Sequence, residues 1–162
     1  MAIGLKHISH AKLPVADVRA SAAWYRSLLD LELGAEFVED GELRGVQLFD
    51  RDGHFGIALR DRRYCASHPD LTGFDAFAIE AESVAVLHAL ASRADSLGVA
   101  HTGVQDRGEY GANLDVSDPD GTVLRFVTNN PIRPGRFICI ESGQDQQFRL
   151  YDVPRFITDH AT

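Results

Sequence analysis

The sequence has few cysteines, a shortage of basic residues and no long apolar segment, and each shortage excludes a class of protein. Its 162 residues include only two cysteines, Cys65 and Cys139, which stand in unlike contexts without metal-ligand spacing. Two free thiols are typical of a reducing compartment, and residues 1–6 lack the apolar core of a secretory signal peptide. We therefore expect a cytoplasmic protein without disulfides.

Charge and hydropathy narrow the range of partners. The chain has 16 Lys and Arg against 24 Asp and Glu, which gives a formal net charge of −8. Nucleic-acid binding needs a basic surface to neutralise phosphates, so we expect no nucleic-acid partner. No apolar run approaches the roughly 20 residues of a membrane-spanning helix, so we expect no membrane partner. Composition and length suit one globular domain.

The signature motifs of several common enzymes are also missing. The sequence has no nucleophile elbow, phosphate-binding loop or C-x-x-C pair. Glu109 and Asp115 have the chemistry of a general base, but the sequence gives neither of them a partner.

The clearest positive feature is the turn Asp118-Pro119-Asp120-Gly121. Proline fixes φ at one corner of a turn, and glycine accepts a positive φ at another. Runs rich in apolar residues precede and follow the turn, over 110–116 and 122–127. This pattern predicts a β-hairpin.

The order of predicted elements repeats along the chain. Each series consists of a strand, a helix and three further strands, and a polar linker over 61–72 separates the two. Asp17 caps the first helix, and Gly34 is expected to end it. The first series is predicted at 7–15, 17–29, about 35–39, 43–49 and 54–60, and the second at 74–79, 83–97, 99–104, 110–116 and 122–127.

Residues 129–162 depart from this repeat. Strands are predicted near 136–140 and 148–151, and several aromatic residues argue against a disordered tail. We expect this C-terminal extension to pack on the domain or on a partner subunit.

Three segments give the chain a family likeness. They are His10–Asp17 followed by Trp24–Leu29, Phe74–Phe77, and Tyr110-Gly111 leading to the Asp118–Gly121 turn. Together they resemble the vicinal oxygen chelate superfamily, which contains glyoxalases, bleomycin-resistance proteins, fosfomycin-resistance enzymes and extradiol dioxygenases. The likeness covers about residues 4–128.

The resemblance implies an α+β fold of two βαβββ units, about 4–60 and 73–128, within one domain over 1–128. The units would form a curved, barrel-like mixed sheet around a cavity, with residues 129–162 as a C-terminal extension. It also implies a homodimer, because cavities in this superfamily are often built at dimer interfaces.

Metal-dependent members of the superfamily hold the ion with up to four His or Glu side chains on strand positions facing the cavity. The resemblance places these positions at His10, Ala58, Phe74 and Arg125. Of the four, only His10 has a suitable donor, and Arg125 stays positively charged. Asp75 is the only conceivable substitute, and strand alternation is expected to turn it to the other face. We therefore expect no metal and no other cofactor.

A weaker alternative keeps the metal. A bulge in the first strand would bring His7 and His10 to one face, with His54 as a further ligand. The protein would then be a metal-dependent lyase, isomerase or extradiol-type dioxygenase. A third hypothesis is a regulatory or structural homodimer without a catalytic role.

Strand alternation and the resemblance direct a set of side chains at the cavity. Those expected to bind a ligand are His10, Lys12, His54, Ala58, Phe74, Tyr110 and Arg125. Arg125 offers a planar fork for an anionic group, and Phe74 offers a stacking surface. Four of these residues also have a purely structural interpretation. Arg125 could pair with an acid, Phe74 could belong to the core, His10 could be a hydrogen-bonded core residue, and Tyr110 could be a turn residue. The prediction is a metal-free protein that binds an anionic or aromatic metabolite or drug-like compound.

Overall fold

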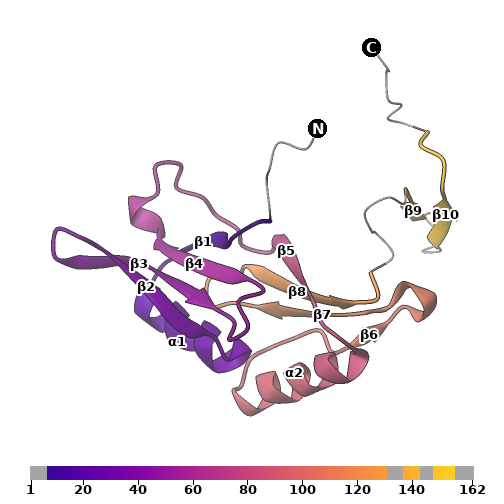
Figure 1. Cartoon of the computed structure of the whole chain (residues 1–162), viewed down its shortest axis with the longest axis horizontal. Coiled ribbons are helices and arrows are strands. Elements are labelled where there is room, and N and C mark those ends of the chain that lie inside the picture. The colour runs from indigo at the N-terminus through magenta and orange to yellow at the C-terminus, as the bar shows by residue number, and fades with distance from the viewer. Residues whose placement is uncertain (1–6, 131–136, 143–147, 156–162) are drawn as a thin grey trace.

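The computed structural model describes residues 7–130, 137–142 and 148–155. The described chain contains two four-stranded mixed sheets, each with one α-helix packed against it (Figure 1). The sheets are curved but do not close into a barrel. The predicted α+β fold of two βαβββ units is therefore confirmed.

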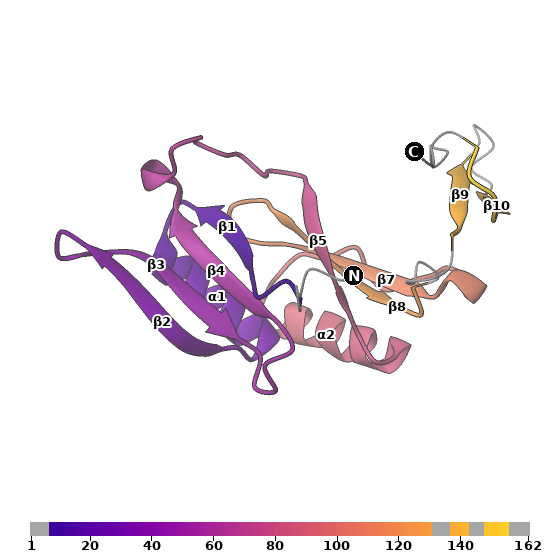
Figure 2. The same ribbon diagram turned by 45° about the horizontal axis from the view of Figure 1, so that its top comes forward.

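The first unit follows the predicted order of elements. It consists of β1 (Ala11–Val15), α1 (Val18–Leu29), β2 (Glu32–Glu39), β3 (Glu42–Phe49) and β4 (Gly56–Asp61). β1 pairs in parallel with β4, and β4, β3 and β2 pair in antiparallel fashion, so the sheet order is β1-β4-β3-β2. The β2–β3 hairpin extends away from the second unit (Figure 2).

The second unit repeats this topology. It consists of β5 (Asp75–Glu80), α2 (Val84–Ser96), β6 (Gln105–Asp106), β7 (Ala112–Ser117) and β8 (Val123–Thr128), in the sheet order β5-β8-β7-β6. Two short 3-10 helices, η1 (Arg62–Tyr64) and η2 (Gly108–Tyr110), lie in the connections.

Helix α1 begins where the sequence predicts. The Asp17 carboxylate accepts hydrogen bonds from the backbone N–H groups of Arg19 and Ala20, which satisfies two of the free donors at a helix start. The helix ends at Leu29, the last residue of the predicted range, and its C-cap is Asp30, whereas Gly34 was expected to end it. Asp30 adopts the left-handed conformation with φ 55°, which aspartate tolerates better than most residues do.

One strand prediction is wrong, and another strand begins two residues later than predicted. Residues 99–104 form no strand, apart from a single bridge between His101 and Val116, and the strand there is the two-residue β6. The last strand of the first unit begins at Gly56, so His54 lies in the turn that precedes it. Both differences come from reading apolar character as strand where the backbone turns.

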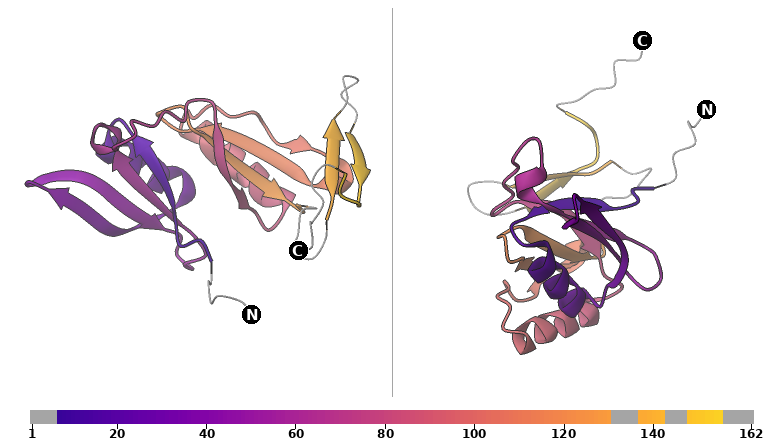
Figure 3. Two further views of the ribbon diagram at one scale, coloured as in Figure 1. Left: turned by 90° about the horizontal axis from the view of Figure 1, so that it is seen from above. Right: turned by 90° about the vertical axis from the view of Figure 1, so that its left-hand side faces the viewer.

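The core lies between the helices and the sheets. Both helices cover the same side of the molecule (Figures 1 and 3). The buried residues of α1 recur at the three- and four-residue spacing of one helix face, and alternate strand residues meet them. The most completely buried apolar side chains include Leu13, Tyr25, Leu28, Leu48, Ile57, Leu59, Leu87, Leu114 and Leu124.

The turn between β7 and β8 reaches across to the first unit. The Asp120 carboxylate accepts hydrogen bonds from the Ala16 backbone N–H at 3.0 Å and from Arg62 Nη2 at 2.6 Å. Asp120 is therefore one of the residues that set how the two units sit against each other.

The C-terminal extension contains a further hairpin, β9 (Cys139–Ser142) with β10 (Phe148–Tyr151), which forms a sheet of its own. The predicted strand at 148–151 is confirmed, and the earlier one lies slightly later than predicted, its first predicted residue being outside the described ranges. Packing of the extension on the domain or a partner stays a prediction. None of the described helices has the length and apolar character needed to cross a membrane.

Candidate functional site

The face of each sheet that turns away from its helix is the candidate site, and we refer to it as the inner face. In the first unit it carries alternate residues of the strands. Lys12 of β1 lies beside Ala58 of β4, which lies beside Gln47 of β3. Among the described residues no α-helix covers this face (Figures 1 and 3). Exposed side chains on it, such as Lys12, can therefore contact a ligand or another molecule.

Glycines let aromatic rings lie on the inner face of the first unit. A Cβ atom on Gly45 would stand 2.7 Å from the Leu59 carbonyl oxygen and 3.5 Å from the Phe37 ring. A Cβ atom on Gly34 would overlap the Phe49 ring. The sequence therefore leaves room for both rings to lie over the backbone. Phe37 remains 45% exposed.

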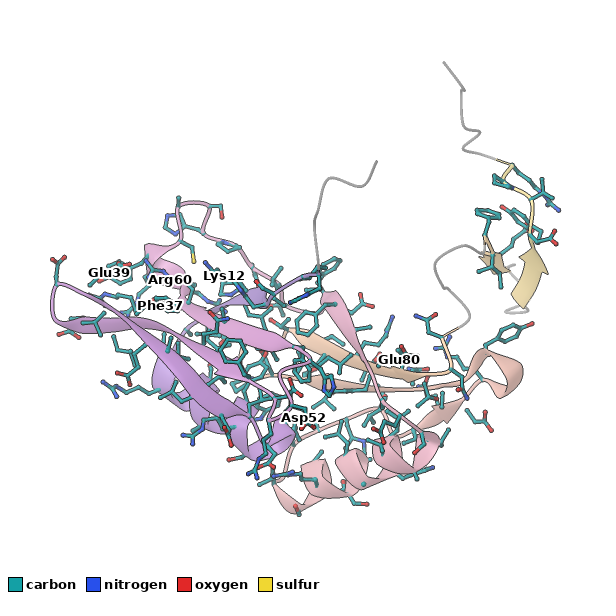
Figure 4. The ribbon with its side chains drawn as sticks, viewed as in Figure 1. Lys12, Phe37, Glu39, Asp52, Arg60 and Glu80 are labelled. Carbon is teal, nitrogen blue, oxygen red and sulfur yellow. The ribbon has the colours of Figure 1, made fainter. Side chains whose placement is uncertain are left out.

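Charged side chains border these rings. Arg60 Nη1 lies 2.8 Å from Glu39 Oε1, and Figure 4 shows both near Phe37 and Lys12. The hydrogen bond from Arg60 lowers the pKa of Glu39, and the same bond raises the pKa of Arg60. Lys12 is exposed and has no ion-pair partner among the described residues. The described inner face of the first unit thus presents an aromatic surface beside Lys12, a cation outside the ion pairs of the described residues.

The inner face of the second unit is built around Arg125 of β8. Its Nε and Nη2 donate to the two oxygens of Asp115 at 2.9 Å and 2.8 Å, and its Nη1 lies 2.5 Å from Asp75 Oδ2. These contacts raise the pKa of Arg125, the hydrogen bond to Asp115 contributing most. The structural interpretation of Arg125, pairing with an acid, is what the structure shows.

Asp75 lies on the inner face, against the prediction from strand alternation. The β5–β8 register shifts between Asp75, which pairs with Val123, and Ala78, which pairs with Arg125. This irregularity turns the Asp75 carboxylate toward Arg125. A bulge of this kind has no mark in the local sequence, so alternation alone could not have placed Asp75.

The remaining predicted residues are scattered. Lys12 and Ala58 lie side by side on the first unit, with Ala58 buried. His10 precedes β1, and its Nδ1 lies 3.0 Å from the Ser9 hydroxyl. Phe74 precedes β5 and is 57% exposed, which argues against the core interpretation. Tyr110 ends η2 and is half-buried.

His54 does not face the cavity as predicted. It lies in the exposed turn before β4, where its Nδ1 is 3.1 Å from Asp50 Oδ2. Asp50, Asp52 and His54 bring ligand atoms within 4.8 Å of one another, but Asp50 also accepts the Phe55 backbone N–H. Within the described residues this is the one such group, and it does not include His10.

The four positions that the resemblance assigns to a metal do not fit one. Ala58 has no donor atom, Phe74 offers a ring, and Arg125 is a cation already held by two carboxylates. A divalent ion needs several N, O or S ligands around one point. His10 alone cannot supply them.

Hollows on the helix side of the described residues include two where no site was predicted. One, of about 330 Å³, lies between α1 and α2 and is lined by Leu28, Leu29, Phe55, Ile79, Glu80, Ala81, Val86, Ala89, Leu90, Arg93 and Phe126. The other, of about 470 Å³, lies at the start of α1 and is lined by Ala16, Asp17, Val18, Arg19, Glu42, Leu43, Arg44, Asp61, Arg62 and Arg63. Neither contains a predicted site residue.

Comparison with known proteins identifies the family. Residues 7–126 match the sequence profile of the Glyoxalase/Bleomycin resistance protein/Dioxygenase superfamily. The chain therefore belongs to this superfamily, as the resemblance in its motifs implied. No curated protein matches the chain.

Solved structures from the superfamily share the fold. TnmS3, an antibiotic-binding protein from Streptomyces sp. CB03234, has a TM-score of 0.65 and 19% identity, covering 78% of this chain and 98% of that one. A lactoylglutathione lyase from Agrobacterium tumefaciens has a TM-score of 0.60 and 19% identity, covering 77% and 95%. A superfamily domain from Frankia sp. EAN1pec is 25% identical with a TM-score of 0.61, covering 82% and 96%.

Proposed function

We propose that this protein binds an aromatic small molecule on its inner faces without a metal ion. The observation that carries the proposal is an exposed aromatic ring on the inner face of the first unit: Phe37, which pairs with Gly45 and is 45% exposed. Phe74, just before β5, is 57% exposed and is the predicted second stacking surface. Covering such a ring contributes about 1.5–3 kcal/mol, which is a large share of the affinity of a small ligand.

Independence from metal is supported by the chemistry of the assigned positions. Ala58, Phe74 and Arg125 offer no ligand, and the Asp75 and Asp115 carboxylates already bind a guanidinium. The antibiotic-binding neighbour supports the same class of function by its fold alone.

The proposal includes a homodimer that covers the inner faces. The β2 edge strand leaves Phe37 and Val38 exposed, and large apolar side chains grouped on a surface mark an interaction site. A second copy placed over the open side would bury these residues and enclose the ligand. Cytoplasmic location belongs to the same proposal and rests on the cysteine content.

The test is a binding screen of aromatic compounds against protein treated with a chelator and then dialysed. We expect hits whose affinity falls about tenfold or more in Phe37→Ala and in Phe74→Ala, because each variant removes a stacking surface. Leu97→Ala is the matched control, since Leu97 is 46% exposed at the end of α2, away from the inner faces. Hits unaffected by either Phe variant would contradict the site.

Metal analysis of the purified protein provides the second arm. Stoichiometric Zn, Ni, Mn or Fe, with ligand binding lost after chelation, would contradict metal independence. It would favour the metal-dependent lyase, isomerase or dioxygenase hypothesis instead.

A further inference from the structure

The inner face of the second unit holds a guanidinium between two carboxylates. Arg125 and Asp115 are direct cross-strand partners in β8 and β7, and Asp75 reaches the same guanidinium from β5. The backbone N–H of Asp115 is in turn held by the Thr102 hydroxyl at 3.1 Å. Three strands therefore fix the position of one cation.

This arrangement changes what Arg125 can offer a ligand. Three of the five N–H groups of a guanidinium make these contacts, so two N–H groups remain. The side chain keeps 39% of its surface exposed, so the open inner face gives access to them. Arg125 is thus still a hydrogen-bond donor.

Its positive charge, however, is more than neutralised. One guanidinium and two ionised carboxylates give the group a net charge of minus one. Glu80 lies on the same face, since Ala78 pairs with Arg125 and Glu80 pairs with Val127 (Figure 4). A carboxylate or phosphate approaching Arg125 would meet the Asp75 and Asp115 carboxylates at close range, where like charges repel.

We propose that the ligand group received by Arg125 is an uncharged hydrogen-bond acceptor, such as the carbonyl of an aromatic amide or ketone, and that anionic groups are rejected. This inference rests on the proposed function and names its ligand class. It replaces the anionic ligand that the Arg125 fork alone suggested.

A matched pair of probes tests the proposal: 2-naphthamide and 2-naphthoate, which share one ring system and differ in charge at pH 7. Each is titrated into the ¹⁵N-labelled full chain and followed by NMR, including the Arg125 Nε–H signal. We expect the amide to bind at least about tenfold more tightly than the carboxylate. The Arg125 signal should move with the amide.

The double variant Asp75→Asn/Asp115→Asn carries the decisive contrast. It gives the group a net charge of plus one, so the preference should reverse in favour of 2-naphthoate. The control is Glu36→Gln, which removes a negative charge from an exposed β2 position paired with Val46, on the helix side of the sheet. Circular dichroism checks that each variant folds.

The outcomes separate the two proposals. If neither probe binds and the aromatic screen also gives no hit, the proposed function is overturned and the selectivity with it. If the probes bind but 2-naphthoate binds the wild type as tightly as the amide, only the present inference is overturned. An unchanged preference in the folded double variant overturns it as well.

Discussion

The Tyr25 hydroxyl donates a 2.7 Å hydrogen bond to Asp118 Oδ2, and both side chains are buried. Tyr25 belongs to α1 of the first unit, and Asp118 opens the turn between β7 and β8 of the second. Burial raises the pKa of Tyr25, with Asp118 adding to the effect, so the phenol stays protonated and can donate. The Asp118-Pro119-Asp120-Gly121 turn therefore holds the two units together as well as forming a hairpin.

Tyr25→Phe should destabilise the protein by about 1–3 kcal/mol, because it leaves a buried carboxylate oxygen without its side-chain donor. Urea unfolding followed by circular dichroism measures the loss. Tyr64→Phe is the control: Tyr64 is 47% exposed, and surface changes usually fall within about 0.5 kcal/mol. Equal losses of unfolding free energy in the two variants would show that the Tyr25–Asp118 hydrogen bond does not stabilise the protein.

Asp61 should make the protein sensitive to acid. This residue is 3% exposed, and the hydrogen bonds from Arg63, with the nearby Arg44, lower the pKa of its carboxyl below the usual value. A depressed folded-state pKa supplies stability that is present above the unfolded value of about 3.9 and is lost as the pH falls through the folded value.

Unfolding free energies measured between pH 2 and pH 7 should therefore fall less steeply on acidification in Asp61→Asn than in the wild type. Asp40→Asn is the control, because Asp40 is exposed in the β2–β3 turn and has no ion pair in the described structure. Asp118 affects the pH dependence of stability in the opposite direction, because burial raises the pKa of its carboxyl. The stability that this raised pKa supplies is present at low pH and is lost as the pH rises through the folded-state pKa. If the unfolding free energy of Asp61→Asn fell as steeply on acidification as that of the wild type, Asp61 would not be a source of the acid sensitivity.

Dimer formation can be tested through Val38, which is 57% exposed on β2. We expect the wild type to sediment as a dimer, and Val38→Lys to shift the equilibrium toward monomer, because a charge would be buried at the contact. Leu97→Lys introduces the same charge on the helix side and should leave the mass unchanged. A monomeric wild type at micromolar concentration would contradict the proposed dimer.

Much of the fold was readable from the sequence because its signals are local. The Asp17 cap and the turn at 118–121 each depend on neighbouring residues, and both were confirmed. The extra strand at 99–104 was wrong because an apolar run with β-branched residues suits an irregular connection packed on the core as well as a strand.

The candidate site was harder to read because its geometry depends on pairing between distant strands. Arg125 could be placed on the inner face, but Asp115 and Asp75 approach it from two other strands, one of them through a register shift. Local sequence records neither the pairing nor the bulge. The aromatic rings of Phe37 and Phe49 were missed for a related reason: the glycines that accommodate them lie on neighbouring strand segments.

Gly111 should be the least replaceable glycine near the inner face. Its backbone has φ 83° and ψ −152°, a region that only glycine visits readily, and an added Cβ atom would overlap the Thr128 carbonyl oxygen. Gly111→Ala must therefore disturb the start of the β7–β8 pairing, where Ala112 pairs with Thr128.

Gly108, in the same turn, provides the matched control. It also has a positive φ, 61°, but a Cβ atom there would have nothing within 4 Å. Gly108→Ala should therefore cost only the conformational strain of about 1–2 kcal/mol, whereas Gly111→Ala should cost about 3 kcal/mol more. Urea unfolding of both variants measures the difference, and equal costs would show that the contact with Thr128 relaxes freely. Because β8 also carries Arg125, a folded Gly111→Ala protein should in addition show a shifted Arg125 Nε–H signal, and Gly108→Ala should not.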